Sequence, residues 1–222
     1  MTVPVIAIDG PSGVGKGTAA RGLARRLGWN FLDSGALYRI LALAAQGRGI
    51  DLADAAAVAA LAPGLEIRFV PGAGADDRIE VGGVDWTAQV RAETTGQLAS
   101  QIASEPGIRA VLLQRQRSFR QEPGLVADGR DMGTVVFPDA GVKVFLDASP
   151  EERARRRMLQ LRQAGVEARM RALCEEIAER DERDRNRPHS PLKPAKDAVV
   201  IDTTDLSADA VIARIEQLVK AP

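Results

Sequence analysis

A glycine-rich segment that directly follows an apolar stretch is the feature that most constrains how this chain can fold. Residues 3–9 (VPVIAID) are apolar and rich in β-branched side chains, which is typical of a buried strand. The next nine residues read GPSGVGKGT, in which Gly10 and Gly15 bracket four residues and Lys16 follows. Residues 16–27 then carry apolar side chains at helical spacing. This order of strand, loop and helix is the one that a phosphate-binding loop requires.

The chemistry of this loop indicates a nucleoside triphosphate as its ligand. Glycines let backbone N–H groups turn toward phosphate oxygens, the helix adds the positive end of its dipole, and the lysine reaches the terminal phosphates. The strict motif has Ser or Thr directly after the lysine, whereas here Gly17 intervenes, so Thr18 is the hydroxyl expected near magnesium. A dinucleotide-binding loop is excluded, because the glycines do not follow the G-x-G-x-x-G spacing. The expected contacts are Gly10, Pro11, Ser12, Gly13, Val14, Gly15, Lys16, Gly17 and Thr18.

The rest of the chain alternates short apolar runs with longer amphipathic ones. The pattern predicts further strands at 29–33, 125–128, 142–147 and 198–202, and helices at 35–46, 106–120, 150–163, 167–186 and 207–219. Strands that alternate with helices in this way predict a parallel sheet covered by helices on both faces. The fold class is therefore α/β, a P-loop NTPase core with a five-stranded parallel sheet flanked by helices.

Two segments depart from this rhythm. Within 62–100 the runs LEIRFV and RIEV, separated by the glycine-rich PGAGADD and followed by a Gly-Gly pair, predict a small antiparallel β insertion. Residues 150–187 contain 11 arginines and 9 acidic residues, which predicts a helix pair laced by ion pairs, with most of its charges in solvent.

Composition limits the partners. Lys and Arg number 30, as do Asp and Glu, so a net charge of zero disfavours a nucleic-acid coat or an anionic-membrane binder. The single cysteine, Cys174, cannot form an internal disulfide, and no Cys/His cluster is present for zinc. No apolar run reaches the length of a membrane span, and Asp9 interrupts the first apolar stretch. We expect a soluble, cytoplasmic monomer that binds neither nucleic acid nor membrane.

Arginines outside the loop suggest which class of nucleotide enzyme this is. A guanine-reading N-K-x-D segment is absent, which argues against a GTPase. A kinase that acts on a small phosphorylated acceptor needs a second anion pocket, and Arg is suited to bidentate contacts with phosphate. Candidates follow predicted strands or cluster late in the chain: Arg39, after a strand-to-helix turn that Ser34 is expected to cap, Arg130 after the strand at 125–128, and Arg180 and Arg187 around Asp184.

Four motifs together resemble the bacterial cytidylate kinase family, a branch of the nucleoside monophosphate kinases. They are GPSGVGKGT, LDSGALYR, RQRSFRQEPGLVADGRDMGTVVFPDA and ERDERDRNR, and the resemblance runs from about residue 4 to 205. It implies phosphoryl transfer from ATP to CMP or dCMP, giving ADP and CDP or dCDP with Mg²⁺, in pyrimidine nucleotide metabolism. It also implies three parts: a core of 1–61, 101–149 and 188–222, a monophosphate-binding insertion at 62–100 and a lid at 150–187.

The resemblance assigns roles to individual residues. Lys16, Arg130 and Arg187 are implied as catalytic, and the acceptor's phosphate is held by Ser34, Arg39, Arg130 and Arg187. Asp131 and Arg109 are implied to read cytosine, with Ser100 completing the pocket, and Arg180 and Asp184 to bind the ribose. Cytosine offers an amine at N4 for a carboxylate and acceptors at N3 and O2 for a guanidinium, whereas uracil presents a carbonyl at the first position.

Some assignments stay open at this level. Tyr38 either packs near the acceptor or is an ordinary aromatic side chain. Of four lid arginines, at positions 153, 155, 156 and 157, one or two are expected to reach the triphosphate, and Arg157 is named here. Asp9, Asp128 and Asp147 each end a strand, and each suits either a turn or support of magnesium. A kinase of dual uridylate and cytidylate preference, and a regulatory protein that uses the loop as a nucleotide switch, are the alternatives.

Overall fold

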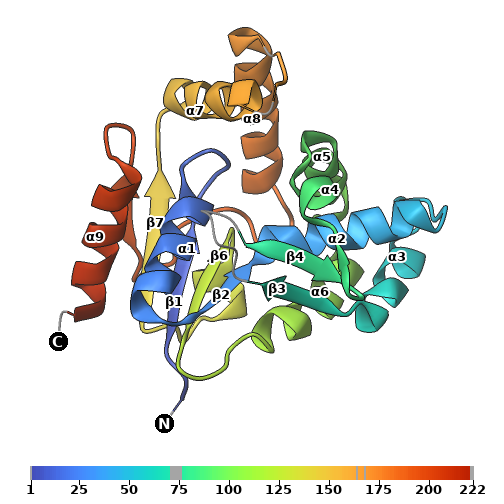
Figure 1. Cartoon of the computed structure of the whole chain (residues 1–222), viewed down its shortest axis with the longest axis horizontal. Helices are drawn as coiled ribbons and strands as arrows, with labels where there is room; N and C mark the ends of the chain where they lie inside the picture. Colours follow the sequence, from blue (N-terminus) through green and yellow to red (C-terminus); the bar gives the residue numbers. More distant parts are fainter. Residues whose placement is uncertain (1, 71–76, 164, 168, 221–222) are drawn as a thin grey trace. The chain divides into compact units, whose positions relative to one another are not determined.

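The computed structural model describes residues 2–70, 77–163, 165–167 and 169–220 (Figure 1). The chain forms two compact units, one of residues up to 32 and from 120 onward, the other of residues 33–119. The boundaries of these units differ from those of the core, insertion and lid expected above, and the three-part division stays a prediction. The glycine-rich part of the expected insertion, 71–76, lies outside the described residues.

A five-stranded parallel sheet organises the first unit, as predicted. Its strand order is β2-β6-β1-β7-β8. The central strand β1 pairs in parallel with β6 and β7 on its two sides, and β7 pairs in parallel with β8. The carboxyl ends of β1, β6, β7 and β8 therefore meet at one edge, where open α/β sheets bind their ligands. The bounds are β1 Val5–Asp9, β2 Asn30–Asp33, β6 Leu125–Gly129, β7 Val142–Asp147 and β8 Val199–Asp202.

Apolar side chains fix two helices against one face of this sheet. Ile6 and Ile8, two residues apart on β1, point to the same face and belong to one buried cluster with Leu23 and Ile215. Leu23 lies on α1 (Lys16–Leu27) and Ile215 on α9 (Ala208–Lys220). Among the described residues, no helix is sufficiently long and apolar for a membrane span.

The other two helices of this unit form a hairpin. The chain leaves β7 and enters α7 (Pro150–Gln163), which packs against α8 (Met170–Arg185) through Ala154, Leu173 and Ile177 (Figure 1). This is the helix pair that the charge-rich segment predicts.

The second unit combines helices with a three-stranded antiparallel sheet of order β3-β4-β5, which confirms the predicted ribbon. Three helices of this unit, α3, α4 and α5, were not predicted. Helices α3 and α4 are short, and α5 has Thr-Thr-Gly in its first turn, residues with a low helix propensity. The bounds are α2 Ser34–Gly47, α3 Ala55–Leu61, η1 Ala62–Gly64, β3 Ile67–Val70, β4 Arg78–Val81, β5 Val84–Asp85, α4 Thr87–Arg91, α5 Glu93–Ile102 and α6 Pro106–Arg117.

The cap of α2 differs from the prediction. Asp33 is the N-cap residue, and its Oδ1 accepts a hydrogen bond from the backbone N–H of Ala36 at 3.0 Å. Ser34, which was expected to cap, is the first helical residue and is buried. The side chains of Asp33 and Ser34 can both accept from the free N–H groups of a first helical turn, so the sequence alone does not determine which of them is the N-cap residue.

Candidate active site

The phosphate loop leaves the central strand β1 at the carboxyl edge of the sheet and ends at Gly15, the N-cap residue of α1. Gly10 has φ +148°, and a Cβ there would collide with the carbonyl oxygen of Leu146 on β7. Gly13 has φ +82°, and a Cβ there would lie 3.0 Å from the Cβ of Arg153. Only glycine fits both positions, so the loop backbone lies tight against its neighbours with its helix directly behind it.

Lys16 is buried at the start of α1, and its Nζ donates to the carbonyl oxygen of Pro11 at 2.6 Å. Burial, and next the positive charge of Arg130, lower the pKa of Lys16 to about 7, against the opposing effect of Asp128. A buried lysine next to another cation is stabilised when an anion binds, because the anion offsets the positive charges of both Lys16 and Arg130. The electrostatics of Lys16 therefore favour a phosphate at this position.

Four further charged side chains form a cluster with Lys16. Asp184 on α8 is 1% exposed, and its carboxylate accepts from Nε of Arg130 at 2.9 Å and from Nη2 of Arg187. Burial alone would raise the pKa of Asp184, but Arg130 and Arg187 outweigh it and lower that pKa. Arg180 is close enough to lower the pKa of both Lys16 and Asp184. One carboxylate thus orients two guanidiniums, and Asp128 and Asp181 also lie close enough to act on the charge of Arg130. Guanidiniums held in this way are suited to bidentate contacts with phosphate.

The segment after β6 carries a second carboxylate into this region. Asp131 is buried and precedes a π-helical turn, η2 (Met132–Val136). The carboxylate of Asp9, at the end of β1, accepts from the backbone N–H groups of Met132 and Gly133, at 2.8 Å each. Burial raises the pKa of Asp9 to about 7 even though these two hydrogen bonds lower it, and the charge of Asp131 raises it further. The sequence left Asp9 open between a turn and support of magnesium, and its hydrogen-bond partners lie more than 120 residues along the chain.

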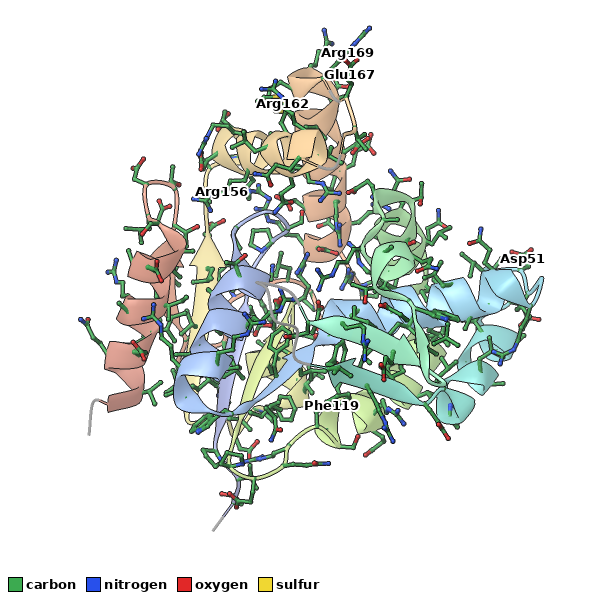
Figure 2. All side chains as sticks on the ribbon, viewed as in Figure 1. Asp51, Phe119, Arg156, Arg162, Glu167 and Arg169 are labelled. Atoms are coloured by element: carbon green, nitrogen blue, oxygen red, sulfur yellow. The ribbon has the colours of Figure 1, made fainter. Side chains whose placement is uncertain are left out.

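Two arginines of α7 hold the loop from the outside. Arg153 Nη1 donates to the carbonyl oxygen of Ser12, and Arg156 Nη1 to that of Val14, both at 3.3 Å. Figure 2 labels Arg156 at the end of α7 nearest the loop, and Arg162, Glu167 and Arg169 toward the far end of the hairpin. Arg157 instead donates to Gln160 of its own helix at 3.2 Å. The sequence signal for the first pair was the spacing of three, which puts both side chains on one helix face.

Arg153 also forms a buried ion pair, with Nη2 2.6 Å from Oδ2 of Asp181 and both side chains at most 5% exposed. We expect Arg153→Met to lower the free energy of unfolding in urea by about 3–5 kcal/mol, because it leaves a buried carboxylate without its cation. Arg155→Met is the matched control, since Arg155 pairs with Glu152 and is 55% exposed. That variant should change stability by about 0–1 kcal/mol.

The double variant Arg153→Met, Asp181→Leu should regain part of the loss, because it removes both buried charges together. Equal losses in Arg153→Met and Arg155→Met would show that the buried pair contributes nothing special to stability.

In the second unit, Arg39 on α2 reaches the junction of α4 and α5. Its Nη1 donates to the carbonyl oxygens of Val90 and Ala92 at 2.9 and 3.1 Å. A Cβ on Gly96, in the first turn of α5, would lie 2.7 Å from Nη2 of Arg39. Backbone contacts thus fix the guanidinium of Arg39, and Gly96 has no side chain that would collide with it.

The remaining predicted residues of this unit lie on three helices. Arg109 of α6 donates to the carbonyl oxygen of Ala103 at 3.1 Å, and its guanidinium carbon is 6.0 Å from the ring centre of Tyr38 on α2. Tyr38 is buried, and so are Ser34 and Ser100. Within the described part of the chain, the Ser100 hydroxyl on α5 has no hydrogen-bond partner. A buried hydroxyl without a partner is costly in a folded protein, and a polar ligand would relieve that cost.

Comparisons with known proteins agree on one family. A family model described as cytidylate kinase matches residues 6–221. The cytidylate kinase of Pseudomonas aeruginosa strain UCBPP-PA14 is 58% identical over 96% of this chain and 93% of its own length. The cytidylate kinase of Serratia proteamaculans is 55% identical over 96% and 93%, and that of Methylococcus capsulatus is 58% identical over 95% and 94%.

Proposed function

The chain belongs to the cytidylate kinase family and transfers a phosphoryl group from ATP to CMP or dCMP, and we propose that fixed cations at two anion sites do most of this work. The products are ADP and CDP or dCDP. The observation that carries the proposal is the arrangement of Lys16, Arg130 and Arg187 around the buried carboxylate of Asp184. Two anionic substrates repel each other, so transfer between them needs positioning and charge neutralisation more than covalent chemistry.

The donor site in this proposal is the loop Gly10–Thr18. Its backbone N–H groups and the start of α1 bind the phosphates of ATP, and Lys16 exchanges its contact with Pro11 for the terminal phosphates. Arg153 and Arg156 support this site by holding the loop carbonyls of Ser12 and Val14. Arg157 is proposed to contact ATP from α7.

Magnesium fits the oxygen donors beside the loop. Thr18 is exposed on the first turn of α1, and Oδ2 of Asp128 would lie 3.3 Å from a Cβ on Gly17. Mg²⁺ commonly keeps several waters and takes one or two protein oxygens together with substrate phosphates. We therefore assign Thr18, with Asp128 nearby, to hold a Mg²⁺ that arrives with ATP. When bound, this ion neutralises phosphate charge and orients the transferring group.

Ser34, Arg39, Arg130 and Arg187 are proposed to bind the phosphate of CMP, while Arg180 and Asp184 bind the ribose hydroxyls. A phosphate oxygen of CMP is already ionised at neutral pH, so it attacks the terminal phosphate of ATP without a general base. Arg130, Arg187 and Lys16 neutralise the charge that spreads over the transferring group.

Base selection is assigned to Asp131 and Arg109, and Ser100 and Tyr38 are proposed as further substrate-binding residues. An ionised Asp131 accepts from the N4 amine of cytosine, and Arg109 donates to N3 or O2. UMP would place a carbonyl against the Asp131 carboxylate, which leaves two acceptors facing each other. The orphan hydroxyl of Ser100 is the observation in the second unit that supports a polar ligand there.

Asp131→Ala tests the base assignment. Because the lost contact is worth about 1–3 kcal/mol, the ratio of kcat/KM for CMP to that for UMP should fall about 5- to 150-fold. The ratio is measured by ADP release with each acceptor at saturating ATP. AMP and GMP serve as further acceptors, and both should stay poor. A ratio that remains at the wild-type value, or a better rate with UMP or AMP in the wild-type enzyme, would contradict the assignment.

We further propose that the enzyme works as a cytoplasmic monomer in pyrimidine nucleotide metabolism. The substrates named above are small molecules, and the proposal needs no partner chain to complete the set of cations.

A further inference from the structure

Asp9 is a buried carboxylate to which the reaction as proposed gives no role. It ends β1, is 4% exposed and uses both oxygens, Oδ1 toward the N–H of Met132 and Oδ2 toward that of Gly133. Both distances are 2.8 Å, toward the short end of the usual range for N–H···O hydrogen bonds. Because each oxygen of Asp9 accepts a hydrogen bond, the plane of its carboxylate and the two backbone N–H groups that it binds are fixed relative to each other.

The two N–H groups are the first of the turn η2, where no preceding turn offers them an acceptor. The carbonyl oxygen of Asp131 accepts within the turn, from the N–H groups of Val135 and Val136 at 2.9 and 3.1 Å. The peptide group between Asp131 and Met132 is therefore held at both its polar atoms, by the turn through the carbonyl oxygen and by Asp9 through the N–H. Single-turn π-helices occur frequently at functional sites, where they re-aim a side chain.

Asp9 also lies next to Gly10 in sequence, where the phosphate loop begins. One side chain thus connects the strand that carries the donor loop with the segment that carries Arg130 and Asp131. Burying a carboxylate is unfavourable, and an apolar residue of similar size would be the cheaper choice if only packing mattered.

We propose that Asp9 is a positioning residue that aims Asp131 at the acceptor's base through the start of η2. This inference rests on the proposed role of Asp131 in reading the N4 amine. Asp9 touches neither substrate in this account. It acts on base selection and on the affinity for CMP, and it leaves the affinity for ATP nearly unchanged.

Asp9→Asn is the central variant. The amide keeps one acceptor oxygen and turns the other position into a donor that faces an N–H, so one hydrogen bond of η2 is lost. We expect the CMP/UMP ratio of kcat/KM to fall about tenfold and KM for CMP to rise about fivefold, from the loss of one buried hydrogen bond. KM for ATP should stay within about twofold of wild type.

A merely structural role would lower the amount of active enzyme without moving these ratios. Asp139→Asn is the matched control, since Asp139 follows the same segment but pairs with Arg120 at the surface. Its ratio and both KM values should match those of the wild type. Asp9→Ser is the second variant, because its shorter, neutral side chain has one oxygen and cannot accept from both N–H groups as Asp9 does. It should lower the CMP/UMP ratio in the same direction and decides the matter if Asp9→Asn does not fold.

Asp131→Ala, measured in parallel, separates the two claims. If Asp131→Ala lowers the CMP/UMP ratio and folded Asp9→Asn or Asp9→Ser does not, the positioning role of Asp9 is overturned and base reading by Asp131 stands. If Asp131→Ala leaves the ratio unchanged, both fall. An equal rise of KM for ATP and CMP in Asp9→Asn would also overturn the positioning role.

Discussion

Replacing Lys16 with methionine is expected to lower kcat/KM by about 10³-fold, because a buried cation at the donor phosphates is lost from the transition state. Methionine fills much of the volume of the lysine stem, so packing at the start of α1 should be retained. The fall should appear with CMP and dCMP alike, since Lys16 acts on the donor. Steady-state ADP release, with thermal unfolding of the same samples, measures the effect.

Lys143→Met is the matched control. Lys143 also lies in the first unit, and its Nζ donates to the carbonyl oxygen of Pro138 at 2.6 Å, as Lys16 donates to that of Pro11. Both residues thus bind a proline carbonyl five positions earlier, but only Lys16 belongs to the phosphate loop. Activity within about twofold of wild type is expected for Lys143→Met, as for a substitution away from the reacting groups. Similar losses in both variants would mean that Lys16 acts through folding rather than on phosphate.

Arg130→Met is expected to lower kcat/KM for CMP by about 10²- to 10³-fold, because a guanidinium at the transferring group is lost and Asp184 loses one of its hydrogen-bonded arginines. Arg130→Lys should recover only part of the rate, since a lysine cannot reproduce the forked contact. KM for CMP should rise in both variants, whereas binding of ATP alone should change little. Initial rates over a matrix of ATP and CMP concentrations separate these effects.

Arg155→Met serves as the control for a lost arginine, because Arg155 lies on α7, has an exposed side chain and pairs with Glu152. A loss below about tenfold in a folded Arg130→Met enzyme, or a loss confined to ATP binding, would contradict the role of Arg130 at the acceptor.

Much of the fold was predictable from the sequence because its signals are local. The strand at 142–147 and the helices at 16–27 and 150–163 have the predicted bounds, since apolar period and glycine or proline boundaries lie within each segment. The short α4 and the Thr-rich α5 escaped prediction, because tertiary packing rather than propensity stabilises helices of this kind.

The candidate site was predictable in its residue types and less so in its contacts. Lys16 and its loop form a contiguous motif, and the arginines of the site could be predicted because they also lie in motifs of the sequence. The link from Asp9 to Met132 joins residues 123 positions apart and depends on a π-helical turn that no periodicity indicates. Likewise, the sequence of α7 did not reveal that Arg153 and Arg156 contact the loop. A helical pattern shows which residues share a face of the helix, but it does not show what packs against that face.

A crystal structure of the enzyme with CMP bound tests the central claim most directly. We predict the phosphate of CMP on the guanidiniums of Arg130 and Arg187, and the N4 amine of cytosine within hydrogen-bonding distance, about 3 Å, of the Asp131 carboxylate. Arg109 should donate to N3 or O2 of the same base. A bound CMP whose base lies away from Asp131, or whose phosphate sits on other cations, would contradict the account.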